Sequence, residues 1–146
     1  MILRDIKNFG TLIIVAFLMT GCMSHYKYQT NTHPYSIYGE TYYPLKSARG
    51  FSETGIASWY GNKFHGRPTA SGEKFNQNAM TAAHKTLPFG TRVRITNLQN
   101  NKTAIVTIND RGPFKSGRII DVSRAAARKL GMIGTGTARV KIKALN

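Results

Sequence analysis

The sequence predicts a mainly β domain, built as a small closed barrel with one short helix. Short segments with alternating apolar and polar or basic residues recur after Thr54, and glycine-rich turns separate them. Only one segment has a helical pattern and a capping residue. Many short strands within about 93 residues favour a closed barrel, because closure removes exposed strand edges.

The expected strands follow one another along residues 54–146. The stretch TGIASWYG is typical of a strand that ends in a glycine turn. TRVRITNL and TAIVTIND flank the turn QNNK, so residues 91–110 are predicted to form a β-hairpin. RIIDV predicts a short strand, and ARVKIKAL predicts a closing strand in which apolar and basic residues alternate.

The single predicted helix covers RAAARKL, residues 124–130. Ser123 precedes it and can cap its first turn, and Gly131 follows it and can end it.

Residues 1–21 have the pattern of an export signal: a charged start, an apolar run too short to span a bilayer comfortably, and small residues before Cys22. The stretch LMTGC resembles a bacterial lipoprotein signal, in which the cysteine is lipidated and becomes the mature N-terminus. No aspartate follows Cys22, so this resemblance implies export to the outer membrane, with a lipid anchor facing the periplasm. The alternative is a plain signal peptide or an N-terminal helix with a chance cysteine.

Residues 22–53 are interpreted as the lipidated cysteine and a flexible tether with little regular structure. This stretch contains six tyrosines and two prolines and has no sustained periodicity. Its tyrosines could pack on the domain or on glycan.

The chain is strongly basic, with 21 Lys and Arg residues against 6 Asp and Glu residues among 146. Removing residues 1–21 takes away two cations and one anion, so the net charge falls only from +15 to +14. Such a charge favours a polyanionic partner, and for an exported protein cell-wall polymers or lipid head groups fit better than nucleic acid. The alternative is that the charge only maintains solubility.

Cys22 is the only cysteine, which excludes an internal disulfide, and no His or Cys pair has metal-ligand spacing. Neither a metal nor a cofactor is predicted.

Three of the remaining acids, Glu73, Asp110 and Asp121, lie in or beside glycine-rich turns at strand ends, where sites are usually built. His84 lies before another such turn, KTLPFG. The ordinary alternative for each acid is a salt bridge to one of the many arginines.

Five blocks follow in order: GIASWYG, FHGRPTASGEKF, MTAAHKTLPFGTRVRITN, INDRGPF and GRIIDVSRAAARKLG. Together they resemble the rare lipoprotein A (RlpA) family over residues 54 to about 144. The resemblance implies a six-stranded double-psi β-barrel, the fold of expansins, acting as a monomer on peptidoglycan. The chain ends at Asn146 without the SPOR domain that many members carry, which argues against septal targeting.

The activity that the resemblance implies is lytic transglycosylation. Such an enzyme cleaves the β-1,4 bond between N-acetylmuramic acid and N-acetylglucosamine in peptide-free glycan strands and leaves 1,6-anhydro ends. The alternative is a non-catalytic lipoprotein that binds peptidoglycan or loosens the wall.

By motif position, the resemblance implies Glu73, His84 and Asp110 as the functional set, and expansin barrels place an aspartate at Asp121. We favour Asp110 as the acid and base, with His84 and Glu73 positioning it or the sugar. Asp121 is the second candidate, and Glu73 the third.

A general acid must be protonated near neutral pH, which requires a pKa about three units above that of a free aspartate. Burial or a neighbouring carboxylate can supply this shift. Because neighbours on a strand face opposite sides, Asp110 can face the groove with Glu73 or Asp121, while Arg111 faces away or holds substrate.

The other predicted substrate contacts are aromatic or polar. Trp59, Tyr60 and Phe114 could line a sugar groove; the alternative is packing in the core, which is favoured more for Tyr60 than for Trp59. Thr69 could donate to sugar hydroxyls or only satisfy its turn.

Overall fold

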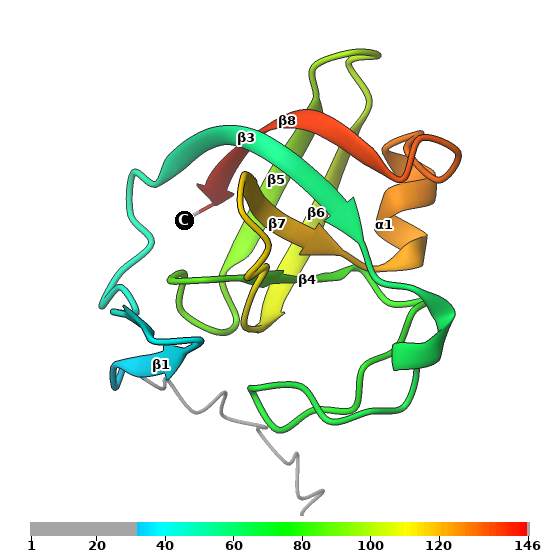
Figure 1. The fold of residues 1–146 in the computed structure, drawn as a ribbon. Helices are drawn as coiled ribbons and strands as arrows, with labels where there is room; N and C mark the ends of the chain where they lie inside the picture. Colours follow the sequence, from blue (N-terminus) through cyan, green and yellow to red (C-terminus); the bar gives the residue numbers. More distant parts are fainter. Residues whose placement is uncertain (1–31, 146) are drawn as a thin grey trace, which may run out of the picture.

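The computed structural model describes residues 32–145 (Figure 1). Its elements in chain order are β1 (Tyr35–Ile37), β2 (Glu40–Tyr42), β3 (Ser52–Trp59), a 3-10 turn η1 (Asn62–Phe64), β4 (Thr81–His84), β5 (Arg92–Asn97), β6 (Thr103–Asp110), β7 (Arg118–Val122), α1 (Arg124–Lys129) and β8 (Thr137–Leu145).

Six strands form a closed barrel in the order β3-β7-β4-β6-β5-β8, and β8 closes on β3. The pairs β3–β7 and β4–β6 are parallel, and the other pairs are antiparallel. The predicted closed six-stranded barrel with one short helix is therefore confirmed.

Alternate residues of the strands fill the barrel interior. Along β8 buried and exposed residues alternate strictly, as the sequence pattern predicts for a strand with one buried face. The largest side chains removed from solvent, all less than 2% exposed, include Leu87, Ile95, Ile108, Ile120, Leu130, Met132 and Ile142.

Two irregularities in strand pairing affect the side chains near the site. In the β4–β6 pair, Ala82 lies opposite Ile108 but Ala83 lies opposite Asp110, so Asn109 is an extra residue. Ile108 points into the core, and a regular strand would turn Asp110 inward as well. The bulge at Asn109 instead places Asp110 on the outer face beside Ala83, which is a common use of bulges. A similar shift occurs in β3 between Ile56 and Ala57.

The predicted hairpin at 91–110, the strand RIIDV, the closing strand and the helix are all present. Ser123 caps the helix, since its side chain accepts a hydrogen bond from the backbone N–H of Ala126. Gly131 follows the helix with φ of +68°, a conformation that glycine adopts without strain.

The predicted tether is wrong for part of its length, because Tyr35–Ile37 and Glu40–Tyr42 pair as an antiparallel hairpin. The two-residue turn has positive φ at both Tyr38 (+51°) and Gly39 (+82°), which fits the twist of a tight hairpin. Two of its tyrosines pack on the domain: the rings of Tyr35 and Tyr42 lie 5.3 Å apart, and both contact Phe114.

The segment at 61–80 forms a long loop on the same side of β4 as the hairpin (Figure 1). Residues 1–31, with the predicted export signal and Cys22, lie outside the described residues. No helix within residues 32–145 is long and apolar enough to cross a membrane.

Candidate active site

Two aspartates face the same side of the barrel on strands separated only by β4. Ser58 of β3 lies opposite Asp121 of β7, Asp121 opposite Ala83 of β4, and Ala83 opposite Asp110 of β6. Residues in lateral register share a face of the sheet, so the two carboxyl groups flank the small Ala83 side chain. With strands about 4.8 Å apart, their Cα atoms are separated by roughly 10 Å.

Three hydrogen-bond donors converge on Asp110. Its Oδ2 accepts from the Tyr60 hydroxyl at 3.0 Å. Its Oδ1 accepts from the backbone N–H of Ala70 at 2.9 Å and from that of Arg111 at 2.8 Å. The carboxyl group is thus held in one orientation by the residue that follows β3, by the 61–80 loop and by the residue that follows β6.

Glu73 supports this arrangement through the bulge. Its Oε2 accepts from the side-chain amide of Asn109 at 2.7 Å, and the carbonyl of Asn109 accepts from the backbone N–H of Ser71. These bonds fix the turn against the end of β6, so that Ala70 can donate to Asp110. Glu73 is therefore close to the site but binds an amide rather than an arginine.

Thr69 serves the same turn. It is 8% exposed, and its hydroxyl hydrogen-bonds to the carbonyl of Glu73 and to the hydroxyl of Ser71. In this structure its polar groups satisfy the turn rather than face the groove.

Asp121 has a different environment from Asp110. Burial raises the pKa of Asp121 above its ordinary value of 3.8, and the Ser58 hydroxyl at 2.7 Å and the Arg118 guanidinium at 4.0 Å only partly oppose this. The charge of Asp110 raises the pKa further. A neighbouring carboxylate thus raises the pKa of Asp121, as expected from the sequence, but burial is the larger cause.

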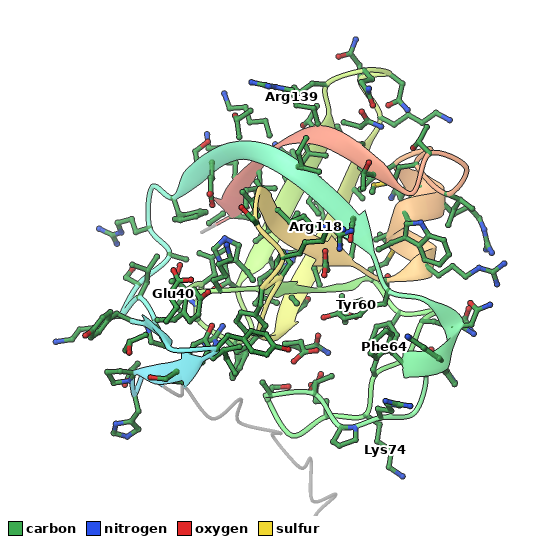
Figure 2. All side chains as sticks on the ribbon, in the orientation of Figure 1. Glu40, Tyr60, Phe64, Lys74, Arg118 and Arg139 are labelled. Carbon is green, nitrogen blue, oxygen red and sulfur yellow. The ribbon has the colours of Figure 1, made fainter. Side chains whose placement is uncertain are left out.

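The Tyr60 hydroxyl lies close enough to both acids for their charges to affect its pKa. Burial raises the pKa of its hydroxyl far above the ordinary range, and both Asp110 and Asp121 raise it further. The phenol therefore stays protonated and acts as a donor. Figure 2 labels Tyr60 beside Phe64, whose ring lies 5.8 Å away.

His84 lies on the opposite face of β4 from Ala83, because it is opposite the inward-facing Ile120. Its Nδ1 accepts from the backbone N–H groups of Thr86 and Leu87, which leaves Nε2 to interact with Glu53 Oε2 at 3.3 Å. The structure thus places His84 at the end of β4, just before the 85–91 loop, and on the face away from the paired aspartates.

Arg111 connects that loop to the site. Its Nη1 donates to the carbonyls of His84 (3.2 Å) and Leu87 (2.7 Å). Its guanidinium lies 3.9 Å from the ring centre of Phe89, and burial lowers the pKa of the group. The side chain faces away from the Asp110 carboxylate but lines the adjoining cavity.

A cavity of about 350 Å³ adjoins Asp110. Its lining residues are Tyr35, Ile37, Ala70, Phe89, Asp110, Arg111 and Phe114. The hairpin, the 61–80 loop, the 85–91 loop and the segment after β6 each supply at least one of them.

Of the three predicted groove aromatics, only Phe114 lines this cavity. Tyr60 lies behind Asp110, and Trp59 packs against the hydrophobic core. Sequence reasoning missed Tyr35, Ile37 and Phe89. The alternation of aromatic and polar residues around Tyr38-Gly39 was the available signal for the first two.

Within residues 32–145, no group of three or more His, Cys, Asp or Glu side chains is arranged to hold a metal ion.

A family model described as "Lytic transglycolase" matches residues 52–142. The endolytic peptidoglycan transglycosylase RlpA of Pseudomonas aeruginosa strain UCBPP-PA14 is 57% identical over 114 residues, which is 78% of this chain. The chain belongs to the RlpA family. The RlpA proteins of Neisseria meningitidis Z2491 (56% identical, 75% of this chain) and Vibrio cholerae O1 N16961 (51%, 76%) are similar to the same extent.

This RlpA-family chain spans a third to just under half of the length of these relatives: 33%, 46% and 42%. The aligned stretches of more than 100 residues are longer than the family-model match. Only four residues follow 142, so these aligned stretches extend into the segment before Ser52, where the hairpin lies.

Two solved structures confirm the double-psi β-barrel predicted for the RlpA resemblance. A Streptomyces papain inhibitor superposes with a TM-score of 0.53 at 23% identity, over 66% of this chain and 96% of its own. The apo expansin of Clavibacter michiganensis superposes with a TM-score of 0.51 at 18% identity, over 66% of this chain and 51% of its own.

Proposed function

We propose that this protein is a peptidoglycan lytic transglycosylase. The observation that carries the proposal is the pair Asp110 and Asp121, which flank one small alanine on the face of a barrel whose RlpA relatives are named endolytic peptidoglycan transglycosylases. The substrate is the glycan strand, cleaved between N-acetylmuramic acid and N-acetylglucosamine.

The reaction needs one proton donor and one proton acceptor. A proton passes to the glycosidic oxygen as its bond to the muramyl C1 breaks. The O6 hydroxyl of the same muramyl residue then bonds to C1 and loses its proton to a base, which gives the 1,6-anhydro ring. Water does not enter the products, in contrast to a hydrolytic glycosidase.

The surroundings of the two aspartates suit different roles. Asp110 accepts three hydrogen bonds and is oriented as an acceptor, so we propose that it takes the O6 proton. Asp121, whose pKa burial raises, fits the proton donor. Glu73 acts through Asn109 and the turn, and His84 acts through the loop that Arg111 holds. Both are proposed as positioning residues.

The decisive experiment incubates the purified chain with peptide-free glycan strands and detects 1,6-anhydro ends by mass spectrometry. Asp110→Asn keeps the shape of the side chain but cannot accept a proton, so release should fall by about 10²–10⁴ while folding and glycan binding survive. Asp121→Asn should lower release by a similar factor. Glu40→Gln, at an exposed position of the hairpin, serves as the control.

The outcomes separate the candidates. If only one of the two variants loses the release of anhydro ends, the aspartate replaced in it performs both proton transfers. If both variants cut as well as wild type, neither is the acid, and Glu73 becomes the candidate. If wild type releases nothing at any pH tested, the chain is a non-catalytic glycan-binding or wall-loosening module.

We further propose that Cys22 carries a lipid that anchors the protein at the outer membrane, on the periplasmic side. Support comes from the LMTGC stretch and from the absence of an aspartate after the cysteine. Cys22→Ser should move the protein from the membrane fraction to the soluble fraction. Unchanged fractionation, together with a wild-type mass that includes no lipid, would contradict this.

A further inference from the structure

The cavity next to Asp110 owes one wall to a segment outside the barrel. Tyr35 and Ile37 of the β1–β2 hairpin line it, and neither lies within residues 52–142 that match the family model. The barrel and its loops supply the other lining residues, among them Phe89, Phe114 and Asp110.

The hairpin is fixed in this position by specific contacts. The Tyr35 hydroxyl donates to the carbonyl of Lys85 at 2.8 Å, in the loop after β4. Tyr35 also stacks on Tyr42, and the ring of Phe114 meets Tyr35 edge-on at 6.2 Å and Tyr42 at 5.4 Å. Burial raises the pKa of the Tyr35 hydroxyl, as expected for a donor that is partly removed from water.

The lining is suited to one kind of sugar. Four of the seven lining residues, Tyr35, Ile37, Phe89 and Phe114, present rings or an aliphatic chain, and the Asp110 carboxylate and the Arg111 guanidinium provide the charges. A small number of polar groups in an apolar pocket is typical of a site that orients a ligand. Among the substituents of glycan sugars, the acetamido group combines an apolar methyl with a carbonyl acceptor and an N–H donor.

We infer that this cavity is a subsite for an N-acetylated amino sugar of the glycan, adjacent to the bond that is cleaved, and that Ile37 of the hairpin determines its selectivity. The inference rests on the proposed function for its substrate class. The acetamido methyl packs among Ile37, Phe89 and Phe114, and the ring is thereby brought against Asp110. A glucose polymer has only a hydroxyl group at this position and leaves the apolar walls unfilled.

Binding, rather than cleavage, tests the subsite. The probes are the tetramer of N-acetylglucosamine and the tetramer of glucose, titrated into the purified chain with labelled isoleucine methyl groups. The N-acetylated tetramer should bind about tenfold or more tightly than the glucose tetramer, the discrimination expected from one methyl group in an apolar pocket. The Ile37 methyl signals should shift on binding, and those of Ile133, which packs against the barrel core, should not.

Ile37→Trp fills the cavity and should abolish the tenfold preference. Ser36→Ala is the matched control, because Ser36 is in the same strand but exposed, and within residues 32–145 its hydroxyl bonds only to that of Thr41. It should bind as wild type does. If Ile37→Trp does not fold, the methyl shifts of wild type decide the question.

Equal binding of the two tetramers, or an N-acetylated tetramer that binds without shifting Ile37, would overturn the inference. So would a folded Ile37→Trp variant that retains the preference. A chain that releases anhydro ends while failing these tests loses the subsite and keeps the proposed function. A chain that passes them without releasing anhydro ends loses the proposed function and keeps the subsite.

Discussion

Asp110 and Asp121 are chemically identical side chains, and only their neighbours separate them. Two backbone N–H groups and a phenol point at Asp110, whereas Asp121 has one hydroxyl and a guanidinium 4.0 Å away. Such a pair of acids in unequal surroundings is a general device for obtaining a proton donor and a proton acceptor near neutral pH.

The raised pKa of Asp121 has a consequence for stability. The folded protein binds this proton more tightly than the unfolded chain, so the associated stabilisation is complete below about pH 4 and is lost as pH rises through the folded-state pKa. Asp121→Asn has no proton to lose. Its free energy of unfolding should therefore rise relative to that of wild type as pH increases above about 4. Urea unfolding of both proteins measures this difference, and a constant difference would contradict the burial effect.

The sequence could predict the identities of the site residues better than their positions. Residues at strand ends in glycine-rich blocks pointed to Asp110, Glu73 and Asp121, and the structure brings all three to one region. His84 was expected in the same set, yet it lies on the other face of β4. His84 follows the regular alternation of β4, whereas the face on which Asp110 emerges depends on the bulge at Asn109, which alternation alone does not reveal.

Among the elements, the turn at 68–74 contributes most to the site. The bridge between Pro68 and Lys74 closes it, and it presents the backbone N–H of Ala70 to Asp110. Gly72 adopts φ of +89° within it, and a Cβ there would meet no atom within 4 Å. A larger residue at Gly72 would therefore lose stability only through its strained backbone conformation and not through a steric clash.

Gly72→Ala should cost about 1–2 kcal/mol through this strain. Because the distorted turn weakens one hydrogen bond to a carboxylate, release of anhydro ends should fall by about tenfold. Gly61→Ala is the control: Gly61 has φ of −68° and equal space around it. Thermal unfolding and the glycan assay on both variants provide the measurement, and equal losses in the two would exclude the turn as the cause.

The elements with regular alternation were predictable, since one buried face requires that pattern. The hairpin at 91–110 and the strand β8 are the clearest cases. The hairpin at 35–42 was not predicted, because Tyr38 takes a positive φ that aromatic residues seldom adopt, and no Asn-Gly or Asp-Gly signal is present. Strand β4 has only four residues, which is too short for its pattern to be distinctive.

At the scale of the whole molecule, the outer face of β5 and β8 is strongly basic. Five exposed cations lie along it: Arg92, Arg94, Arg139, Lys141 and Lys143. Arg94 is directly opposite Lys143 in the register, and within residues 32–145 none of the five forms a salt bridge with an acid. Arg139 lies at the end of the barrel away from Glu40 and Lys74 (Figure 2).

Binding to anionic wall sacculi should therefore weaken as salt is added, since charges are screened beyond about 10 Å at 0.1 M ionic strength. Replacing Arg92, Arg94 and Lys143 together by glutamine should lower both the affinity and its salt dependence. Cleavage of short soluble strands should not change, because none of the three lines the cavity. Co-sedimentation with sacculi over a salt series gives the measurement.

The control variant replaces Lys46, Arg128 and Lys129, which are exposed elsewhere, and removes the same charge. If it reduces sacculus binding equally, net charge and not the β5–β8 face is responsible. If neither variant alters the salt dependence, hydrogen bonds and apolar contacts dominate binding.

The bond between Glu73 and Asn109 has a consequence for how an alanine scan of this protein should be interpreted. Asn109 is the extra residue that turns Asp110 outward, and Glu73 is the acceptor for its buried side chain. Without that acceptor, strand β6 can return to regular pairing, which would carry Asp110 into the barrel and leave an amide on its outer face. An inactive Glu73→Ala protein would then have lost the bulged register of β6 and not a group that transfers protons. A cleavage assay alone does not distinguish these two losses.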